Sequence, residues 1–270
     1  MRLLSVLFFF NLVLLLQHTA LGQGFSVSPS RITLSGNPGE TVTQAVNFTN
    51  SSNAPLTFSS NIQDWDRDSV GVKVYYPKNS RSASNASWLT LSSNSITIQP
   101  GQSHQLILSM TIPATAKELT HSMLFFKQVK EQQPKKSATT RLGVNVLIEV
   151  GIQVYYTPPG LAQGELNFLS FEDRGIADKG NTKSRQVALK IQNTGKVNKD
   201  GFIRMELTNK DTGEEIKVDA VTLAILPERT QWVIFNLPIS LKGKFLAVAL
   251  LDAGPDYDLK VAEKEIIYRP

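Results

Sequence analysis

Apolar and polar residues alternate over short stretches of this chain, and turn-forming residues separate one stretch from the next. A period of two is typical of a β-strand with one face in a core, whereas an amphipathic helix repeats every 3.6 residues. From residue 25 onward no segment keeps a helical period over three turns, and the best helical candidate is the short stretch 114–119. The strands predicted in the first half of the chain are 26–34, 41–49, 56–63, 70–75, 95–98, 104–112, 122–129 and 142–156.

The alternation stops at Thr157-Pro158-Pro159-Gly160 and then begins again. Prolines have no N–H to donate, so two in succession end a strand. About seven or eight short strands in each half are typical of an immunoglobulin-like sandwich. The sequence therefore predicts an all-β chain of two immunoglobulin-like β-sandwich domains, residues 23–157 and 158–270, joined by this Pro-rich elbow. The strands predicted in the second half are 164–171, 185–193, 201–208, 216–218, 221–226, 231–237, 244–251 and 260–268.

The first 22 residues have the pattern of a secretory signal. Arg2 supplies a positive charge, an apolar run follows from residue 3 to residue 16, and the small residues Ala20 and Gly22 stand where a cleavage site needs them. The run is shorter than the ~20 residues that a membrane-spanning helix needs. We therefore expect residues 1–22 to be a cleaved signal peptide and the mature protein to be periplasmic, without a transmembrane anchor.

The chain has 270 residues, of which 41% are hydrophobic and 19% charged, and it has no cysteine. A disulfide framework, a thiolate metal site, a cysteine nucleophile and a lipid-bearing cysteine are therefore excluded. The formal net charge is +5, and the basic residues are scattered rather than gathered into a stripe with aromatic residues. Nucleic-acid binding is not expected from such a pattern.

The usual catalytic motifs are missing from the sequence. It has no nucleophile-elbow, P-loop or dinucleotide-binding pattern, and His104 and His121 have no partner at catalytic or metal-binding spacing. Asp64-Trp65-Asp66-Arg67-Asp68 begins like a calcium loop, but Ser69 and Tyr75 stand where that loop needs glycine and glutamate. We predict no enzymatic activity, no cofactor and no metal site. The Asn-x-Ser/Thr motifs, which accept glycans only in a glycosylating host, begin at Asn47, Asn50 and Asn85.

The predicted strand 142–156 is unusually long and regular. Its odd positions are mostly polar or small, and at ~3.3 Å per residue it would run about 45 Å, further than strands of about five or six residues can cover. It is either an ordinary core strand that leads into the elbow or a strand that offers apolar side chains to a partner lacking a strand. Its even positions are all apolar: Leu142, Val144, Val146, Ile148, Val150, Ile152 and Val154.

Four motifs carry a resemblance to a known family. They are Ser28-Pro29-Ser30-Arg31-Ile32-Thr33-Leu34, Ile98-Gln99-Pro100-Gly101, Ser122-Met123-Leu124-Phe125-Phe126, and Val144-x-Val146-x-Ile148 leading to Ile152-Gln153-Val154-Tyr155-Tyr156-Thr157-Pro158. With these motifs in this order, residues 25–158 resemble the PapD-type periplasmic chaperones of pilus subunits. The second domain matches less well and is longer than is usual in that family.

The resemblance implies two contacts with a pilus-type subunit. A first-strand arginine and a lysine near the end of the long strand would hold the subunit's C-terminal carboxylate in the cleft between the domains. Arg31 matches the arginine, but Gln153 stands where the lysine is expected. An amide donates a hydrogen bond without bringing charge, so charge-assisted anchoring is weakened. The residues that would be lent to an incomplete, immunoglobulin-like subunit are Leu142, Val144, Val146 and Ile148.

We therefore predict a periplasmic chaperone that binds a secreted or envelope client by donating an alternating apolar strand, and so prevents its aggregation before envelope or pilus assembly. The alternative is a structural adaptor of a cell-envelope secretion or surface-attachment complex. A long apolar edge could equally pair with itself in a dimer. A carbohydrate-binding sandwich would need an aromatic platform, and Trp65, Trp88 and Trp232 are too scattered to indicate one.

Overall fold

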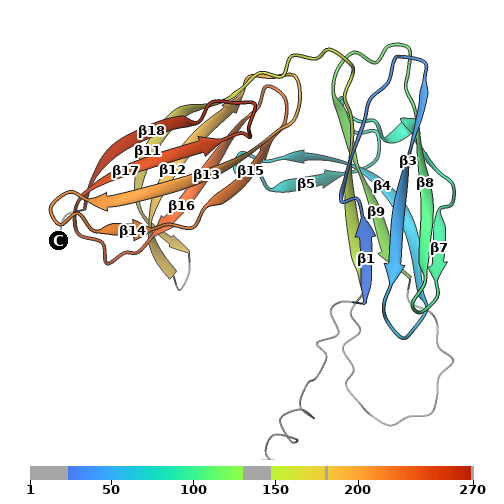
Figure 1. The fold of residues 1–270 in the computed structure, drawn as a ribbon, viewed down its shortest axis with the longest axis horizontal. Helices are drawn as coiled ribbons and strands as arrows, with labels where there is room; N and C mark the ends of the chain where they lie inside the picture. The colour runs from blue at the N-terminus through green and yellow to red at the C-terminus, as the bar shows by residue number, and fades with distance from the viewer. Residues whose placement is uncertain (1–23, 130–146, 180–181, 269–270) are drawn as a thin grey trace, which may run out of the picture.

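The computed structural model describes residues 24–129, 147–179 and 182–268, and nearly all of its regular structure is β-strand (Figure 1). In these residues the only helical element is the 3-10 turn η1 (Ala86–Trp88). The stretch 114–119, the best helical candidate in the sequence, contains a turn and a bend but no helix. No helix in the described part of the chain is long and apolar enough to cross a bilayer. The predicted all-β fold of two sandwiches is confirmed.

The first sandwich is formed by ten strands in two sheets. Its four-stranded sheet has the order β1-β3-β8-β6, and its six-stranded sheet has the order β2-β10-β9-β4-β5, with β7 also paired to β4. These strands are β1 (Phe25–Ser28), β2 (Arg31–Leu34), β3 (Thr41–Asn50), β4 (Leu56–Arg67), β5 (Lys73–Tyr76), β6 (Leu89–Leu91), β7 (Ser95–Ile98), β8 (Ser103–Thr111), β9 (Thr120–Gln128) and β10 (Glu149–Tyr156).

The chain changes sheet at Pro29, where the sequence predicted one continuous strand over 26–34. β1 pairs antiparallel with β3, whereas β2 pairs parallel with β10 in the opposite sheet. Proline has no N–H for a ladder hydrogen bond, so Pro29 ends one pairing and the chain begins another. As a result, two consecutive strands form the edges of two different sheets on the same side of the sandwich.

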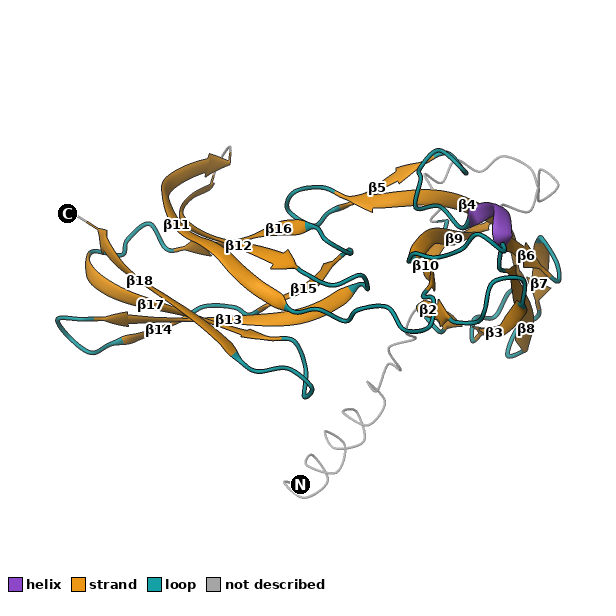
Figure 2. Ribbon diagram, turned by 90° about the horizontal axis from the view of Figure 1, so that it is seen from above, coloured by secondary structure: helices purple, strands orange, loops and turns teal. Residues whose placement is uncertain are grey.

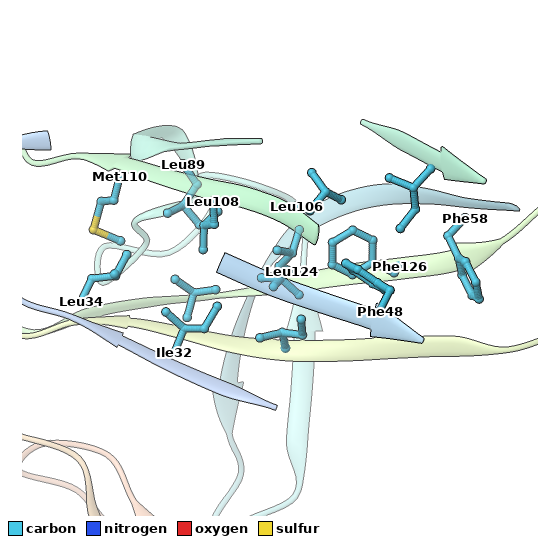
Figure 3. Close-up of a cluster of buried hydrophobic side chains, with 14 of the residues drawn as sticks. Ile32, Leu34, Phe48, Phe58, Leu89, Leu106, Leu108, Met110, Leu124 and Phe126 are labelled. Carbon is cyan, nitrogen blue, oxygen red and sulfur yellow. The ribbon is translucent and has the colours of Figure 1, made fainter. Parts of the chain in front are cut away.

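Side chains from both sheets alternate inward and fill the space between them (Figure 3). At the centre, the rings of Phe48 and Phe126 meet edge to face with centroids 4.7 Å apart. β10 contributes Ile152 and Val154, both of which are fully buried. The period of two in the sequence therefore corresponds to inward and outward positions on real strands.

The second sandwich packs the three-stranded sheet β11-β12-β16 against the five-stranded sheet β14-β13-β17-β18, in which β15 also pairs with β13. The first two strands of this sandwich are longer than predicted. The sequence predicted that the first ends at residue 171 and the second begins at residue 185, but β11 continues to Lys179 and β12 begins at Thr182. The extension begins with Glu172, Asp173 and Arg174, so apolar alternation did not reveal it. The strands are β11 (Leu166–Lys179), β12 (Thr182–Asn193), β13 (Lys199–Asn209), β14 (Glu215–Lys217), β15 (Val221–Ile225), β16 (Thr230–Leu237), β17 (Gly243–Asp252) and β18 (Lys260–Tyr268).

The chain linker and a two-stranded extension of the first sandwich both reach the second sandwich (Figures 1 and 2). The chain passes from β10 to β11 through residues 157–165. In addition, β4 and β5 leave the first sandwich as a two-stranded extension toward the second, residues 64–76, which we call the β4–β5 arm. The buried apolar side chains at the junction are Trp65, Leu119, Met123, Tyr155, Val197 and Leu226.

We expect Phe126→Ala to lower the free energy of unfolding by about 3–5 kcal/mol, because it leaves a cavity beside Phe48 in the first core. Urea denaturation followed by tryptophan fluorescence measures this loss. Ile267→Ala, at a side chain that is 56% exposed, is the control and should change the free energy little. Equal losses for both substitutions would contradict the assignment of this core.

Candidate functional site

β10 has a partner strand along the whole of one side and along only half of the other. All of Glu149–Tyr156 pairs with β9, but β2 reaches only Gln153–Tyr156. The Gln153 N–H donates to the Ser30 carbonyl at 3.2 Å, and alternate residues of a strand direct their N–H and C=O groups to the same side. The backbone groups of Glu149 and Gly151 therefore face an edge that no strand covers in the described residues.

The apolar row of β10 becomes less buried toward this open edge. Val154 and Ile152 are fully buried, whereas Val150 and Ile148 are only half-buried, and Ile148 packs on the margin of the first core. Because β1 is also an edge strand, its Phe25 lies half-buried on the same core. This side of the sandwich thus exposes both unpaired backbone and incompletely covered apolar side chains.

The described part of the long strand belongs to the core at its C-terminal end. Ile152 and Val154 are buried, and within the described residues regular pairing begins at Glu149. Of the four predicted strand donors, Ile148 lies just before β10. The other three predicted donors lie outside the described residues: Leu142, Val144 and Val146.

Arg31 and Gln153, the two predicted carboxylate anchors, lie opposite each other in the parallel β2–β10 pair. Both point to the outer face of the sheet, toward the second sandwich, where they border one cleft of about 840 Å³. The Tyr155 hydroxyl donates to Oε1 of Gln153 at 3.0 Å, and burial raises the pKa of Tyr155 to about 12. The amide of Gln153 therefore keeps its Nε2 hydrogens for another acceptor.

Arg31 already has a carboxylate partner in the structure. Its guanidinium donates to Asp200 of β13, so this ion pair joins the two sandwiches. Burial alone would lower the pKa of Arg31, but the hydrogen bond and the charge of Asp200 outweigh that effect and raise it. Sequence reasoning missed this contact, because Asp200 is 169 residues away from Arg31 in the chain.

The β4–β5 arm brings two further cations to the same cleft, and sequence reasoning missed both. Arg67 donates to the Gly71 carbonyl at 2.7 Å, and Lys73 stands on the paired strand with its Nζ 5.8 Å from the ring centroid of Trp65. Burial lowers the pKa of Lys73, and the charges of Arg67 and Arg31 lower it further. The positive charges of Arg31, Arg67 and Lys73 therefore lie close enough to affect one another.

The tip of the arm contacts the second sandwich directly. The Trp232 N–H donates to the Ser69 carbonyl at 2.8 Å, which is a backbone hydrogen bond between the two domains. Gly71 has a φ of +87°, and a Cβ there would overlap the side-chain amide of Gln231. A glycine is needed at this position for both reasons, since it accepts positive φ and permits the close approach.

The predicted elbow lies in the segment that joins the sandwiches. The Thr157 N–H donates to the Leu34 carbonyl at 2.9 Å, so Thr157 still continues the ladder of β10 with β2. Pro158 is buried, whereas Pro159 and Gly160 are exposed. The role of these four residues as an elbow, and the domain boundary beside them, stay predictions.

The acidic run that began like a calcium loop has structural partners. The buried Asp64 carboxylate accepts hydrogen bonds from the backbone N–H groups of Ser80 and Arg81, and Asp68 caps the turn of the arm. Asp66 pairs with the Arg81 guanidinium at 2.9 Å. No group of three or more metal-ligating side chains occurs in residues 24–129, 147–179 and 182–268.

A second cleft, of about 780 Å³, lies between the sandwiches near His121, and charges of both signs line it. Arg81 and Arg229 lie against Asp66, and Lys196 pairs with Glu228 at 2.8 Å. This internal pairing distinguishes it from the cleft at Arg31, where cations are in excess.

The three glycosylation motifs differ in accessibility. Asn47 is exposed on β3. Asn50 and Asn85 are fully buried, and the Asn50 amide donates to the Ala54 and Ile98 carbonyls. A glycan on Asn50 or Asn85 is incompatible with the folded domain.

We expect Gly71→Ala to weaken the contact between the arm and the second sandwich, because its Cβ would displace the buried side-chain amide of Gln231. Small-angle X-ray scattering should then give a larger radius of gyration. Gly39→Ala is the matched control, since Gly39 has a similar φ of +91° but open space around the Cβ position. An unchanged radius for Gly71→Ala would contradict a role of this contact in placing the domains.

We expect His121 to make the fold less stable in mild acid. Burial lowers the pKa of His121 from its usual value of 6.5, although the Trp65 carbonyl lies 3.0 Å from Nε2. The unfolded chain thus takes up a proton that the folded chain resists, so the free energy of unfolding falls as the pH drops through about 6.5.

Urea denaturation at about pH 7.5 and about pH 5.5 measures this dependence. His121→Gln should reduce the difference between the two pH values, whereas His104→Gln, at an exposed histidine, should leave it unchanged. The same pH dependence in all three proteins would exclude His121 as its source.

Comparison with known proteins adds likenesses of fold. A scan with protein-family models finds no match for this sequence, and a search of curated proteins finds no relative. The YadV chaperone is 14% identical, with a TM-score of 0.47 over 90% of this chain and 100% of that one. The CsuC–CsuE chaperone–tip adhesion subunit pre-assembly complex of Acinetobacter baumannii is 14% identical, with a TM-score of 0.49 over 88% of this chain and 97% of that one. The structure of the Salmonella enterica SafA pilin in complex with the SafB chaperone matches at 14% identity, with a TM-score of 0.44 over 93% of this chain and 99% of that one.

Proposed function

We propose that this chain is a periplasmic, chaperone-type binding protein that adds a strand of a client protein to the open edge of β10. The single observation that carries the proposal is the half-paired state of β10: among the described residues, Glu149–Ile152 have β9 on one side and no strand on the other. An added strand would continue the line of β2 and complete the ladder. The role is one of binding and shielding, and the proposal assigns no reaction to the chain.

The energetics of such an addition favour a specific client strand. Each backbone hydrogen bond gained at Glu149 or Gly151 is worth about 0.5–1.5 kcal/mol net, and it does not depend on the sequence of the client. Selectivity comes from alternate side chains, which in this chain are the half-buried Ile148 and Val150. Gly151 has no side chain on the outer face, where a Cβ would lie 3.0 Å from Phe125 and 3.2 Å from Met123 of β9.

The sequence extends the same apolar row toward residue 142. We include Leu142, Val144 and Val146 in the proposed donor row because their spacing continues that of Ile148. In this proposal they fill a groove in a client that lacks one strand, and the client in turn covers the apolar margin of the first core. Both partners lose exposed strand edge, which is the feature that otherwise promotes aggregation.

The proposed export rests on residues 1–22, which have the charge, apolar run and small residues of a signal peptide. Partners in this proposal are secreted or envelope proteins, such as pilus-type subunits. Arg31 and Gln153 are the proposed anchors for the carboxylate at the end of the client chain, and their adjacency across β2 and β10 supports that role.

We expect Ile148→Asp to abolish stoichiometric recovery of the client, because it places a charge in the apolar row at the open edge. Val261→Asp is the matched control, since Val261 is an exposed apolar residue on another edge strand, β18. The measurement is affinity capture from the native envelope with mass spectrometry. It is combined with hydrogen exchange, which should show protection of the Glu149 and Gly151 amides only in the complex.

The outcomes separate the candidate functions. Recovery that Ile148→Asp leaves intact would contradict strand donation. Protection of the same amides in the isolated protein at high concentration, together with a dimer in solution, would show that the edge pairs with a second copy instead. A permanent complex that retains this protein after assembly would favour an envelope adaptor over a chaperone.

A further inference from the structure

The cleft beside Arg31 has an unbalanced set of charges. Its volume is about 840 Å³, and it lies between β2, the β4–β5 arm and strands β13, β15 and β16 of the second sandwich. Three cationic side chains and one carboxylate line it: Arg31, Arg67, Lys73 and Asp200.

Aromatic rings and a backbone carbonyl hold Arg67 and Lys73, whereas Arg31 also pairs with the Asp200 carboxylate. The Arg31 guanidinium lies 5.8 Å from the ring centroid of Tyr155, and that of Arg67 lies 5.4 Å from the ring centroid of Trp65. Nε of Arg67 is buried and has no hydrogen-bond partner in the described residues. Burial lowers the pKa of Arg67, and the charge of Arg31 acts in the same direction. A second anion would therefore relieve repulsion among these groups.

Asp200 is held loosely enough to be replaced. Its side chain is 56% exposed and that of Arg31 is 35% exposed, although they form an ion pair. Exposed ion pairs contribute little to stability, because water screens them and both side chains lose freedom. A ligand carboxylate that also reaches Arg67 and Lys73 gains contacts that Asp200 alone does not provide.

We propose that Arg67 and Lys73 supply the charge that Gln153 lacks at the carboxylate site proposed above for Arg31 and Gln153, and that Asp200 is an internal carboxylate which the C-terminal carboxylate of the client strand displaces from Arg31. The inference rests on the proposed strand addition at β10. It adds the residues that recognise the end of the client and the contact that occupies their place in the free protein.

The position of the cleft along β10 supports a strand end as the ligand. β2 runs parallel to β10 and begins at Arg31, opposite Gln153. A client strand parallel to β10 along Glu149–Ile152 would have to stop where β2 begins. Its C-terminus would then lie next to Arg31, with the Nε2 hydrogens of Gln153 on the same face.

Two synthetic peptides test the inference with the full chain. Both alternate valine and threonine, carry an N-terminal acetyl group and are about ten residues long, the upper range of a β-strand. One ends in a free carboxylate and the other in an amide. We expect the carboxylate peptide to bind roughly tenfold more tightly by isothermal titration calorimetry, because a charged acceptor strengthens its hydrogen bonds.

Substitutions then assign the residues. Asp200→Asn should tighten binding of the carboxylate peptide and leave the amide peptide unchanged. Lys73→Gln should weaken only the carboxylate peptide, and Lys73→Arg should restore it. Asp178→Asn and Lys242→Gln are the controls, since they make the same charge changes at exposed sites of the second sandwich that do not line the cleft.

The outcomes test the carboxylate site separately from strand addition at β10. Equal binding of both peptides, unaffected by Asp200→Asn or Lys73→Gln, would overturn the carboxylate site and leave strand addition standing. Binding of neither peptide would contradict strand addition itself. Weaker binding of the carboxylate peptide to Asp200→Asn would show that Asp200 helps to build the site and would overturn its role as a competitor. If Lys73→Gln fails to fold, the two peptides and Asp200→Asn still decide the question.

Discussion

A β-strand carries hydrogen-bonding groups on both sides, and half of one side of β10 has no strand to receive them in the described residues. The rest of the candidate site follows from this edge. β2 cannot cover it, because Pro29 takes the preceding residues into the opposite sheet. The edge therefore ends at Gln153, beside Arg31, and the apolar row next to it changes from buried to half-buried over Ile152 to Ile148.

The junction of the two sandwiches determines what lies beyond that edge. Trp65 and Tyr155 pack with apolar residues of the second domain, and the Ser69–Trp232 backbone hydrogen bond holds the tip of the β4–β5 arm. One side of the junction has carboxylates and cations that neutralise each other, as in the Lys196–Glu228 pair. The other side concentrates cations. The same packing that joins the domains thus creates two clefts of different electrostatic character.

The alternation of apolar and polar residues was enough to predict most strands, because a strand with one buried face places apolar side chains at every second position. It missed features that depend on pairing between distant segments. The arm has polar residues on a strand that leaves its own core, so Arg67 and Lys73 carry no apolar signal, and Asp200 reaches Arg31 only when two domains dock. The polar extension of β11 was missed for the same reason.

The pair formed by Arg31 and Asp200 has one member in each sandwich, so it is a tie between domains as well as an electrostatic contact. A ligand that competes with Asp200 for Arg31 loosens that tie. Thermodynamic linkage requires the reverse with the same factor: a change that holds the domains apart must tighten binding of that ligand. In the proposed mechanism, occupancy of the cleft and the Arg31–Asp200 contact are then linked, with a coupling no larger than the small free energy of an exposed ion pair.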